Sequence, residues 1–89
     1  MNSNENWQLR VRNNLLKGLQ RIPKKDQERL VSAIEGFSTN PFIGDIEKIK
    51  GQENTWRRRI GSYRIFFELF LDEKIVYVFR LERRTSKSY

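Results

Sequence analysis

The chain has 89 residues, which suits one compact domain over residues 1–89, since a second would need about twice this length. It has no cysteine and no histidine, which excludes disulfides and thiolate metal sites and removes the usual neutral-pH acid–base residue. The net charge is +7, and neither a transmembrane-length apolar run nor a secretory signal is present, so we expect a soluble, cytoplasmic protein.

The N-terminal part predicts a strand followed by two helices. Residues 7–12 alternate apolar and polar side chains, which is typical of a half-buried strand. Residues 13–22 change to helical spacing, Pro23 ends that helix, and residues 24–37 continue as a second amphipathic helix. The expected apolar stripes are Leu15, Leu16, Leu19, Ile22, Leu30, Val31, Ile34 and Phe37. These two segments predict a helical hairpin.

The C-terminal part predicts three strands after a loop. The strands are expected at residues 56–60, 63–71 and 74–81, because short polar breaks separate three runs rich in β-branched and aromatic residues. Breaks this short favour hairpins, so the strands should form an antiparallel meander. The order β-α-α-β-β-β predicts an α+β domain, with the N-terminal strand and helical hairpin packed on a small antiparallel sheet.

Strand alternation separates the arginines of this region into two groups. Arg57 and Arg59 share one face of their strand, and Arg58 points to the other. The rows expected to pack under the helices are Tyr63, Ile65, Phe67, Leu69 and Leu71 in the next strand and Ile75, Tyr77, Phe79 and Leu81 in the last. The uncovered face should then present Arg57, Arg59, Arg64 and Arg80, with Phe66 and Phe70 among them. Cations interleaved with aromatic rings can bind phosphates and stack bases.

The charge distribution supports a polyanionic partner. Residues 48–89 carry 11 basic and 5 acidic side chains, and the basic ones are seven arginines and four lysines. Arginine binds phosphate in bidentate fashion, which favours nucleic acid over an acidic protein or an anionic membrane. A purely structural role is the alternative, in which the arginines form cross-strand ion pairs with Glu68, Asp72, Glu73 and Glu82.

The segments KIKG, TWRRRIGSYRIFFEL and IVYVFRLERRTSKSY resemble the RelE/ParE superfamily of type II toxin–antitoxin toxins. The familiar pattern is a Lys-Gly before a strand, W-R-x-R-hydrophobic-G-x-Y-R on a hairpin, and a last strand followed by Arg and Tyr. The resemblance extends from about Trp7 to Tyr89. It implies a single RelE-like toxin domain.

The resemblance also implies an activity. RelE-like toxins are metal-independent endoribonucleases, or mRNA interferases, which cut messenger RNA in the ribosomal A site by attack of a ribose 2′-OH on the adjacent phosphate. On this reading no cofactor or metal is needed, and the partners are a cognate acidic antitoxin and the ribosome. Alternatives are a ParE-like toxin that poisons DNA gyrase and a non-catalytic RNA-binding module.

Matching the motifs assigns roles to residues of this chain. The catalytic set implied by the resemblance is Arg57, Arg59, Arg64, Arg84 and Tyr89, and the implied RNA-binding set is Lys48, Lys50, Arg80, Arg83 and Lys87. Arg58 is expected to have a structural or surface role. An arginine stays protonated, so the base is sought elsewhere, among Tyr89, Lys48, Lys50 and Glu53.

Overall fold

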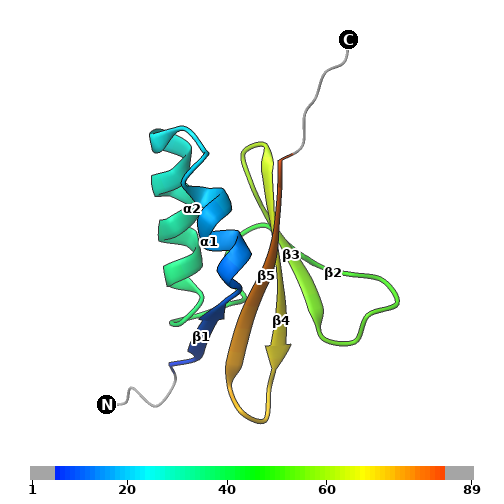
Figure 1. The fold of residues 1–89 in the computed structure, drawn as a ribbon. Helices are drawn as coiled ribbons and strands as arrows, with labels where there is room; N and C mark the ends of the chain where they lie inside the picture. The colour runs from blue at the N-terminus through cyan, green and yellow to red at the C-terminus, as the bar shows by residue number, and fades with distance from the viewer. Residues whose placement is uncertain (1–5, 84–89) are drawn as a thin grey trace.

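A computed structural model describes residues 6–83, which form two helices and a five-stranded sheet (Figure 1). The helices are α1 (Asn13–Leu19) and α2 (Lys24–Gly36). The strands are β1 (Gln8–Val11), β2 (Ile46–Lys48), β3 (Thr55–Ile60), β4 (Tyr63–Phe70) and β5 (Ile75–Arg83).

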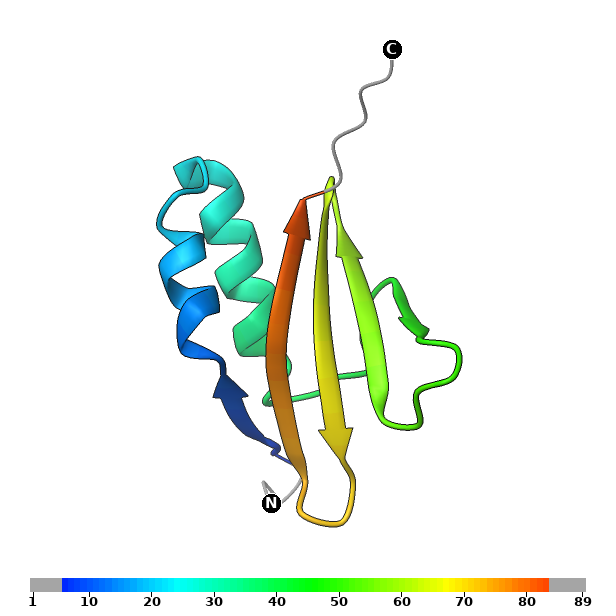
Figure 2. The ribbon, with the colours of Figure 1, turned by 45° about the vertical axis from the view of Figure 1, so that its right-hand side comes forward.

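The strands lie in the order β1-β5-β4-β3-β2, and Figure 2 shows the long β3, β4 and β5 side by side. The predicted α+β fold, with a helical hairpin and an antiparallel meander, is confirmed. Two details differ from the prediction. β1 pairs with β5 in parallel, so the sheet is mixed, and β2 adds an antiparallel edge strand beside β3. β2 has three residues, too few to give a readable period-two pattern.

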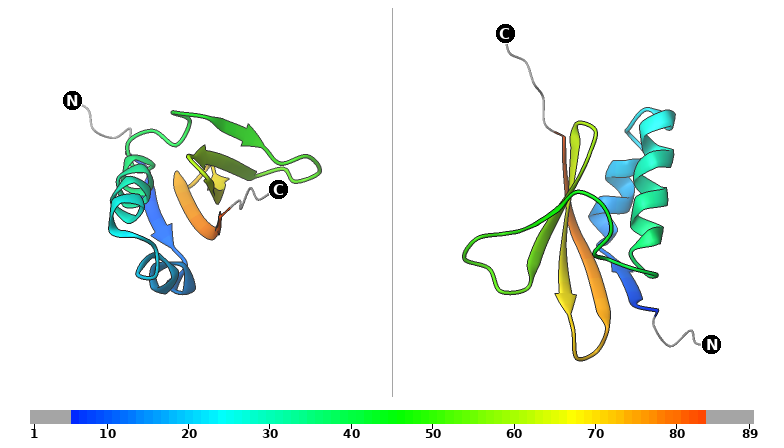
Figure 3. Two further views of the ribbon diagram at one scale, coloured as in Figure 1. Left: turned by 90° about the horizontal axis from the view of Figure 1, so that it is seen from above. Right: turned by 180° about the vertical axis from the view of Figure 1, so that it is seen from behind.

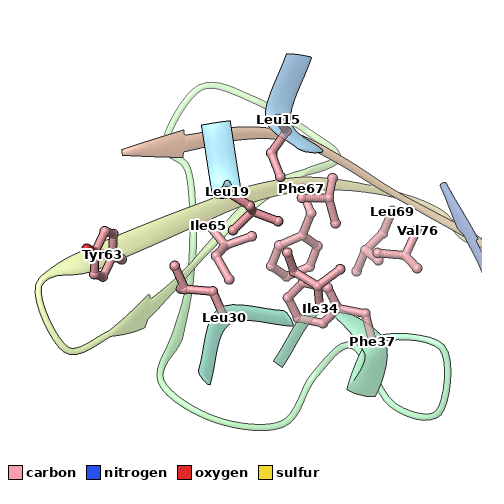
Figure 4. Packing of buried hydrophobic residues seen from close by; sticks show 11 residues of the cluster. Leu15, Leu19, Leu30, Ile34, Phe37, Tyr63, Ile65, Phe67, Leu69 and Val76 are labelled. Atoms are coloured by element: carbon pink, nitrogen blue, oxygen red, sulfur yellow. The ribbon is translucent and has the colours of Figure 1, made fainter. Parts of the chain in front are cut away.

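The helical hairpin covers one face of the sheet (Figure 3). Leu15 and Leu19 of α1 and Leu30 and Ile34 of α2 are buried against it, as predicted (Figure 4). Leu16 was expected on the same stripe but is 49% exposed, because adjacent residues of a helix point about 100° apart and Leu15 takes the side that faces the sheet. Within residues 6–83, no helix has the length and apolar character needed to cross a membrane.

β4 has the regular alternation that its sequence predicts. Tyr63, Ile65, Phe67 and Leu69 are buried under the helices, and the intervening side chains point to the open face. The rings of Phe67 and Phe37 pack with their centroids 4.5 Å apart. Leu71, which was predicted to continue this row, lies beyond the end of the strand and is 62% exposed.

The prediction for β5 was wrong in its first half because the strand contains a β-bulge. Phe66 pairs with Arg80 and Phe67 pairs with Val78, so Phe79 is an extra residue that reverses the alternation. Before the bulge, Val76 and Val78 are fully buried in the core. Ile75 and Tyr77 are on the open face of the sheet, which they share with their β4 partners Phe70 and Glu68. After the bulge, the alternation agrees with the prediction: Leu81 packs against the core and Arg80 is on the open face. The core residues of β5 are therefore Val76, Val78 and Leu81 instead of Ile75, Tyr77, Phe79 and Leu81.

Candidate functional site

The face of the sheet that the helices leave uncovered collects three of the predicted arginines. Arg59 of β3 lies directly opposite Arg64 of β4, and Arg57 lies opposite Phe66. Because partners in register share a face, the three guanidinium groups point to the same side of the sheet. Together with Asp45 and Glu47, they line a depression of about 110 Å³.

The two carboxylates of this depression come from the edge strand β2 and the residue before it. Glu47 is in register with Arg57, and the two side chains form an ion pair. The Nε atom of Arg59 donates a hydrogen bond of 3.2 Å to Oδ2 of Asp45, and its backbone N–H donates to the Asp45 carbonyl oxygen at 2.9 Å. Glu47 and Asp45 are 65% and 61% exposed, and such exposed pairs contribute only about 0–1 kcal/mol. An anionic ligand can therefore displace these carboxylates at little cost.

Asp45 and Glu47 were missed in the sequence. The alternative of cross-strand ion pairs was predicted for Glu68, Asp72, Glu73 and Glu82. Within residues 6–83, only Glu82 of these acids pairs with an arginine of the open face, and that arginine is Arg80. The period-two spacing of Asp45 and Glu47 in GDIEKIK is the signal that could have identified them. It becomes informative only once β2 is known to pair with β3.

Arg64 differs from its two neighbours. It is partly buried, and no carboxylate within residues 6–83 forms an ion pair with it. Its cross-strand partners are Arg59 on β3 and Glu82 on β5, and the carboxylate of Glu82 pairs with Arg80. The like charges of Arg59 and Arg64, directly opposite each other, repel. Bound phosphate would remove this repulsion, so the arrangement favours an anion between the two side chains.

An aromatic row continues from this depression along β4 and β5. The ring centroids of Phe66 and Phe79 lie 6.4 Å apart, and those of Phe79 and Tyr77 lie 6.2 Å apart in a stacked arrangement. The guanidinium carbon of Arg80 lies 5.4 Å from the Phe66 ring centroid, and Arg80 also pairs with Glu82. The bulge therefore adds Phe79 and Tyr77 to a face on which the sequence predicted only Phe66 and Phe70.

The other predicted site residues lie apart from the depression or outside the described residues. Lys48 pairs in register with Trp56, which places it on the helix side of the sheet, and Lys50 and Glu53 lie in the exposed turn between β2 and β3. Arg83 lies over the Tyr63 ring at 5.7 Å and lines a separate cavity of about 420 Å³. Arg84, Lys87 and Tyr89 lie outside the residues that the structure describes.

Tyr63 of β4 is buried on the helix-covered face of the sheet and connects the strand that carries Arg64 to α2. Its hydroxyl donates a hydrogen bond of 3.2 Å to Oδ2 of Asp26 on α2. Burial raises the pKa of this hydroxyl above its usual value of 10.0, although Arg83 acts in the opposite direction. Since Tyr63 directly precedes Arg64, the buried tyrosine fixes the backbone that presents the arginine.

Known proteins share this fold and sequence pattern. Residues 7–87 match the family described as "ParE toxin of type II toxin-antitoxin system, parDE". A Methanocaldococcus jannaschii protein named "Putative toxin RelE1" is 27% identical over 81 residues, which cover 88% of this chain and 90% of that protein.

Two solved structures are similar over almost the whole chain. The archaeal RelE–RelB complex from Pyrococcus horikoshii OT3 gives a TM-score of 0.81 at 21% identity, covering 92% of this chain and 99% of that one. The RelB–RelE antitoxin–toxin complex from Methanococcus jannaschii gives 0.70 at 28% identity, covering 86% and 92%. The resemblance seen in the sequence is confirmed, and the chain belongs to the ParE toxin family of type II toxin–antitoxin systems, within the RelE/ParE superfamily.

Proposed function

We propose that this toxin is a metal-independent endoribonuclease that cuts messenger RNA in the ribosomal A site and so arrests translation and growth. The observation that carries the proposal is the convergence of Arg57, Arg59 and Arg64 around one depression on the open face. A toxin that acts by binding alone has no need for three cations aimed at one small volume. A reaction at phosphorus does, because negative charge develops there.

In the proposed reaction, the ribose 2′-oxygen bonds to the adjacent phosphorus while the bond from phosphorus to the 5′-oxygen of the next nucleotide breaks. The 2′-hydroxyl gives its proton to a base, the departing oxygen takes up a proton, and the products carry a 2′,3′-cyclic phosphate and a 5′-hydroxyl. Arg64 binds the scissile phosphate, and Arg57 and Arg59 stabilise its transition-state charge. None of the three serves as the base, because a guanidinium stays protonated.

The remaining roles rest on the resemblance. Arg84 and Tyr89 complete the proposed catalytic set, with Tyr89 orienting or activating the nucleophile. Lys48, Lys50, Arg80, Arg83 and Lys87 are proposed to hold the messenger or ribosomal RNA backbone. Of these, Arg80 lies on the face of the depression and beside the aromatic row.

An acidic antitoxin is the proposed protein partner. Both solved relatives described above are complexes of a RelE with a RelB. A net charge of +7 favours a partner of opposite sign, and neutralising the arginine face would block RNA. Action on ribosomes and pairing with this antitoxin place the protein in the cytoplasm.

The test is expression of the toxin with mapping of RNA ends. We expect translation to stop and cuts to appear within translated codons, and we expect Arg64→Ala to abolish both. Arg29→Ala is the matched control, because Arg29 is an exposed arginine of α2 that does not line the depression. Binding to programmed ribosomes without cleavage would instead indicate a non-catalytic RNA-binding module.

Gyrase poisoning is the second candidate, because the matched family carries the ParE name. A toxin of this kind would leave messages intact and collapse plasmid supercoiling. The same expression experiment separates the two, provided that supercoiling and RNA ends are measured in the same cells.

A further inference from the structure

Arg58 occupies a position where the fold calls for an apolar residue. It lies on the helix side of β3, opposite Ile65 of β4, which is fully buried, and opposite Ile46 of β2. This confirms the predicted face, away from Arg57 and Arg59. A charge placed here is costly unless something compensates it.

The guanidinium of Arg58 is held between two groups. Its carbon lies 5.9 Å from the ring centroid of Phe37, a core residue with no exposed surface. On the other side lies Gly44, where a Cβ atom would come within 2.7 Å of Arg58 Nε. Gly44 also has φ +97°, which a side chain rarely tolerates. Phe37 and Gly44 therefore fix the orientation of the guanidinium.

The held guanidinium is not satisfied within residues 6–83. Its Nε is buried and has no hydrogen-bond partner, and no carboxylate of these residues pairs with Arg58. A buried donor left without an acceptor costs about 1–3 kcal/mol. A cation that is fixed in orientation and lacks a partner is suited to receive an anion from outside the chain.

Arg58 opens into a pocket of about 260 Å³ that is separate from the arginine depression. The pocket is lined by Ser32, Ala33, Gly36, Asn40, Ile43, Arg58 and Ile60. The Asn40 carboxamide oxygen already accepts the Phe42 N–H at 3.0 Å, which leaves its NH₂ group as a donor. The free polar groups are thus mainly donors, and they are surrounded by apolar walls, including Ile43, which is 55% exposed.

We propose that this pocket binds a carboxylate side chain of the acidic antitoxin, flanked by an apolar side chain that packs on Ile43 and Ile60. The identity of this partner rests on the function proposed above. A single cation among apolar walls fits one carboxylate on a protein better than a nucleic-acid backbone, which needs several cations in series. The pocket also faces away from the depression proposed for RNA, so it offers the antitoxin an anchor that RNA in the depression does not occupy.

The test compares Arg58→Met with Arg29→Met in the full chain, using the cognate acidic antitoxin proposed above as the probe. Methionine keeps the apolar stem of Arg58 and removes the unpaired donor. We expect the Kd of the Arg58→Met complex to rise at least about tenfold, mainly through faster dissociation, with cleavage on programmed ribosomes unchanged and thermal stability unchanged or higher. Arg29→Met should leave all three unchanged. Charge reversal at individual antitoxin acids should reveal one that couples to Arg58 in a double-mutant cycle.

The proposal is overturned if Arg58→Met lowers the melting temperature and leaves the Kd unchanged, because the guanidinium would then only cover Phe37. It is also overturned if Arg58→Met weakens ribosome binding but not the antitoxin complex, which would indicate RNA, or if no stable antitoxin complex forms. Failure of the proposed function gives a different pattern, in which wild type cuts no message while Arg58→Met still weakens the complex.

Discussion

Arg59 and Arg64 lie directly opposite each other on neighbouring strands, on the same face of the sheet. A cross-strand pair of like charges destabilises a sheet, by up to about 1 kcal/mol. Asp45 pairs with Arg59, whereas Glu82, which lies opposite Arg64 on β5, pairs with Arg80, so within residues 6–83 no carboxylate forms an ion pair with Arg64. This relationship is difficult to explain as a device for stability and is readily explained as a phosphate site.

Arg64→Gln should therefore separate activity from stability. We expect cleavage on programmed ribosomes to fall by about 10²–10³-fold, because one donor to the developing charge is lost. The melting temperature should stay the same or rise slightly, because the repulsion with Arg59 disappears. Single-turnover cleavage and thermal unfolding measure the two effects. A large fall in melting temperature would show that Arg64 is structural, and Arg29→Gln serves as the control for loss of a positive charge.

Asp45 and Glu47 compete with RNA for Arg59 and Arg57. The Asp45→Asn, Glu47→Gln double variant should bind a single-stranded RNA oligonucleotide more tightly at low salt, because two cations are released. The salt dependence of log K should steepen by about 0.7 for each arginine that gains a phosphate. Fluorescence anisotropy across a salt series checks this.

Glu73→Gln removes a charge from the exposed β4–β5 loop and is the control for net charge. If the double variant and this control shift affinity equally, the effect is one of net charge alone. Cleavage that falls in Glu47→Gln while RNA binding rises would identify Glu47 as the proton acceptor.

The sequence predicted the face of each residue correctly in strands where successive side chains alternate between the two faces without interruption. It predicted the face wrongly where pairing with the neighbouring strand introduces a bulge. In β4, the charged residues Arg64 and Glu68 lie four positions apart and mark one face, so the faces of Arg64 and Phe66 followed directly. In β5, residues 75–79 are all apolar, and no periodicity reveals that Phe79 forms a bulge. A register shift is decided by pairing with the neighbouring strand, which local sequence does not encode.

The residues of the candidate site likewise fall into those that the sequence placed correctly and those that it did not. Arg57, Arg59 and Arg64 were placed correctly on one face from the sequence because each lies in a regular strand. Asp45 and Glu47 were not, because their position depends on the three-residue β2. Lys48 was expected to serve RNA, but its register opposite Trp56 directs it to the helix side. Its RNA-binding role thus stays a proposal.

Phe66 is expected to stack RNA bases through its ring. It lies between Arg80 and Phe79 on the open face, so Phe66→Leu keeps apolar volume and removes the aromatic surface. We expect affinity for single-stranded RNA to fall by about 1–3 kcal/mol, the usual effect of losing one stacking ring. Phe70→Leu is the matched control, at the far end of the same face of β4. Equal losses in both variants would argue against a specific stacking position.

Tyr63 links stability to alkaline pH. Its pKa is raised by burial above the usual 10.0, which means that the folded state holds the phenolic proton more tightly than the unfolded state. The stabilisation is fully present below the unfolded pKa and is lost as pH rises through the folded pKa, so wild-type stability should decline above about pH 10. Tyr63→Phe removes the hydrogen bond to Asp26, which should cost about 0.5–1.5 kcal/mol at neutral pH, and it removes the tyrosine's share of the alkaline decline. Urea unfolding of both proteins from pH 7 to 11 measures the difference. Parallel curves over this range would show that Tyr63 keeps an ordinary pKa, and unchanged cleavage per folded molecule would confirm that it acts only through the fold.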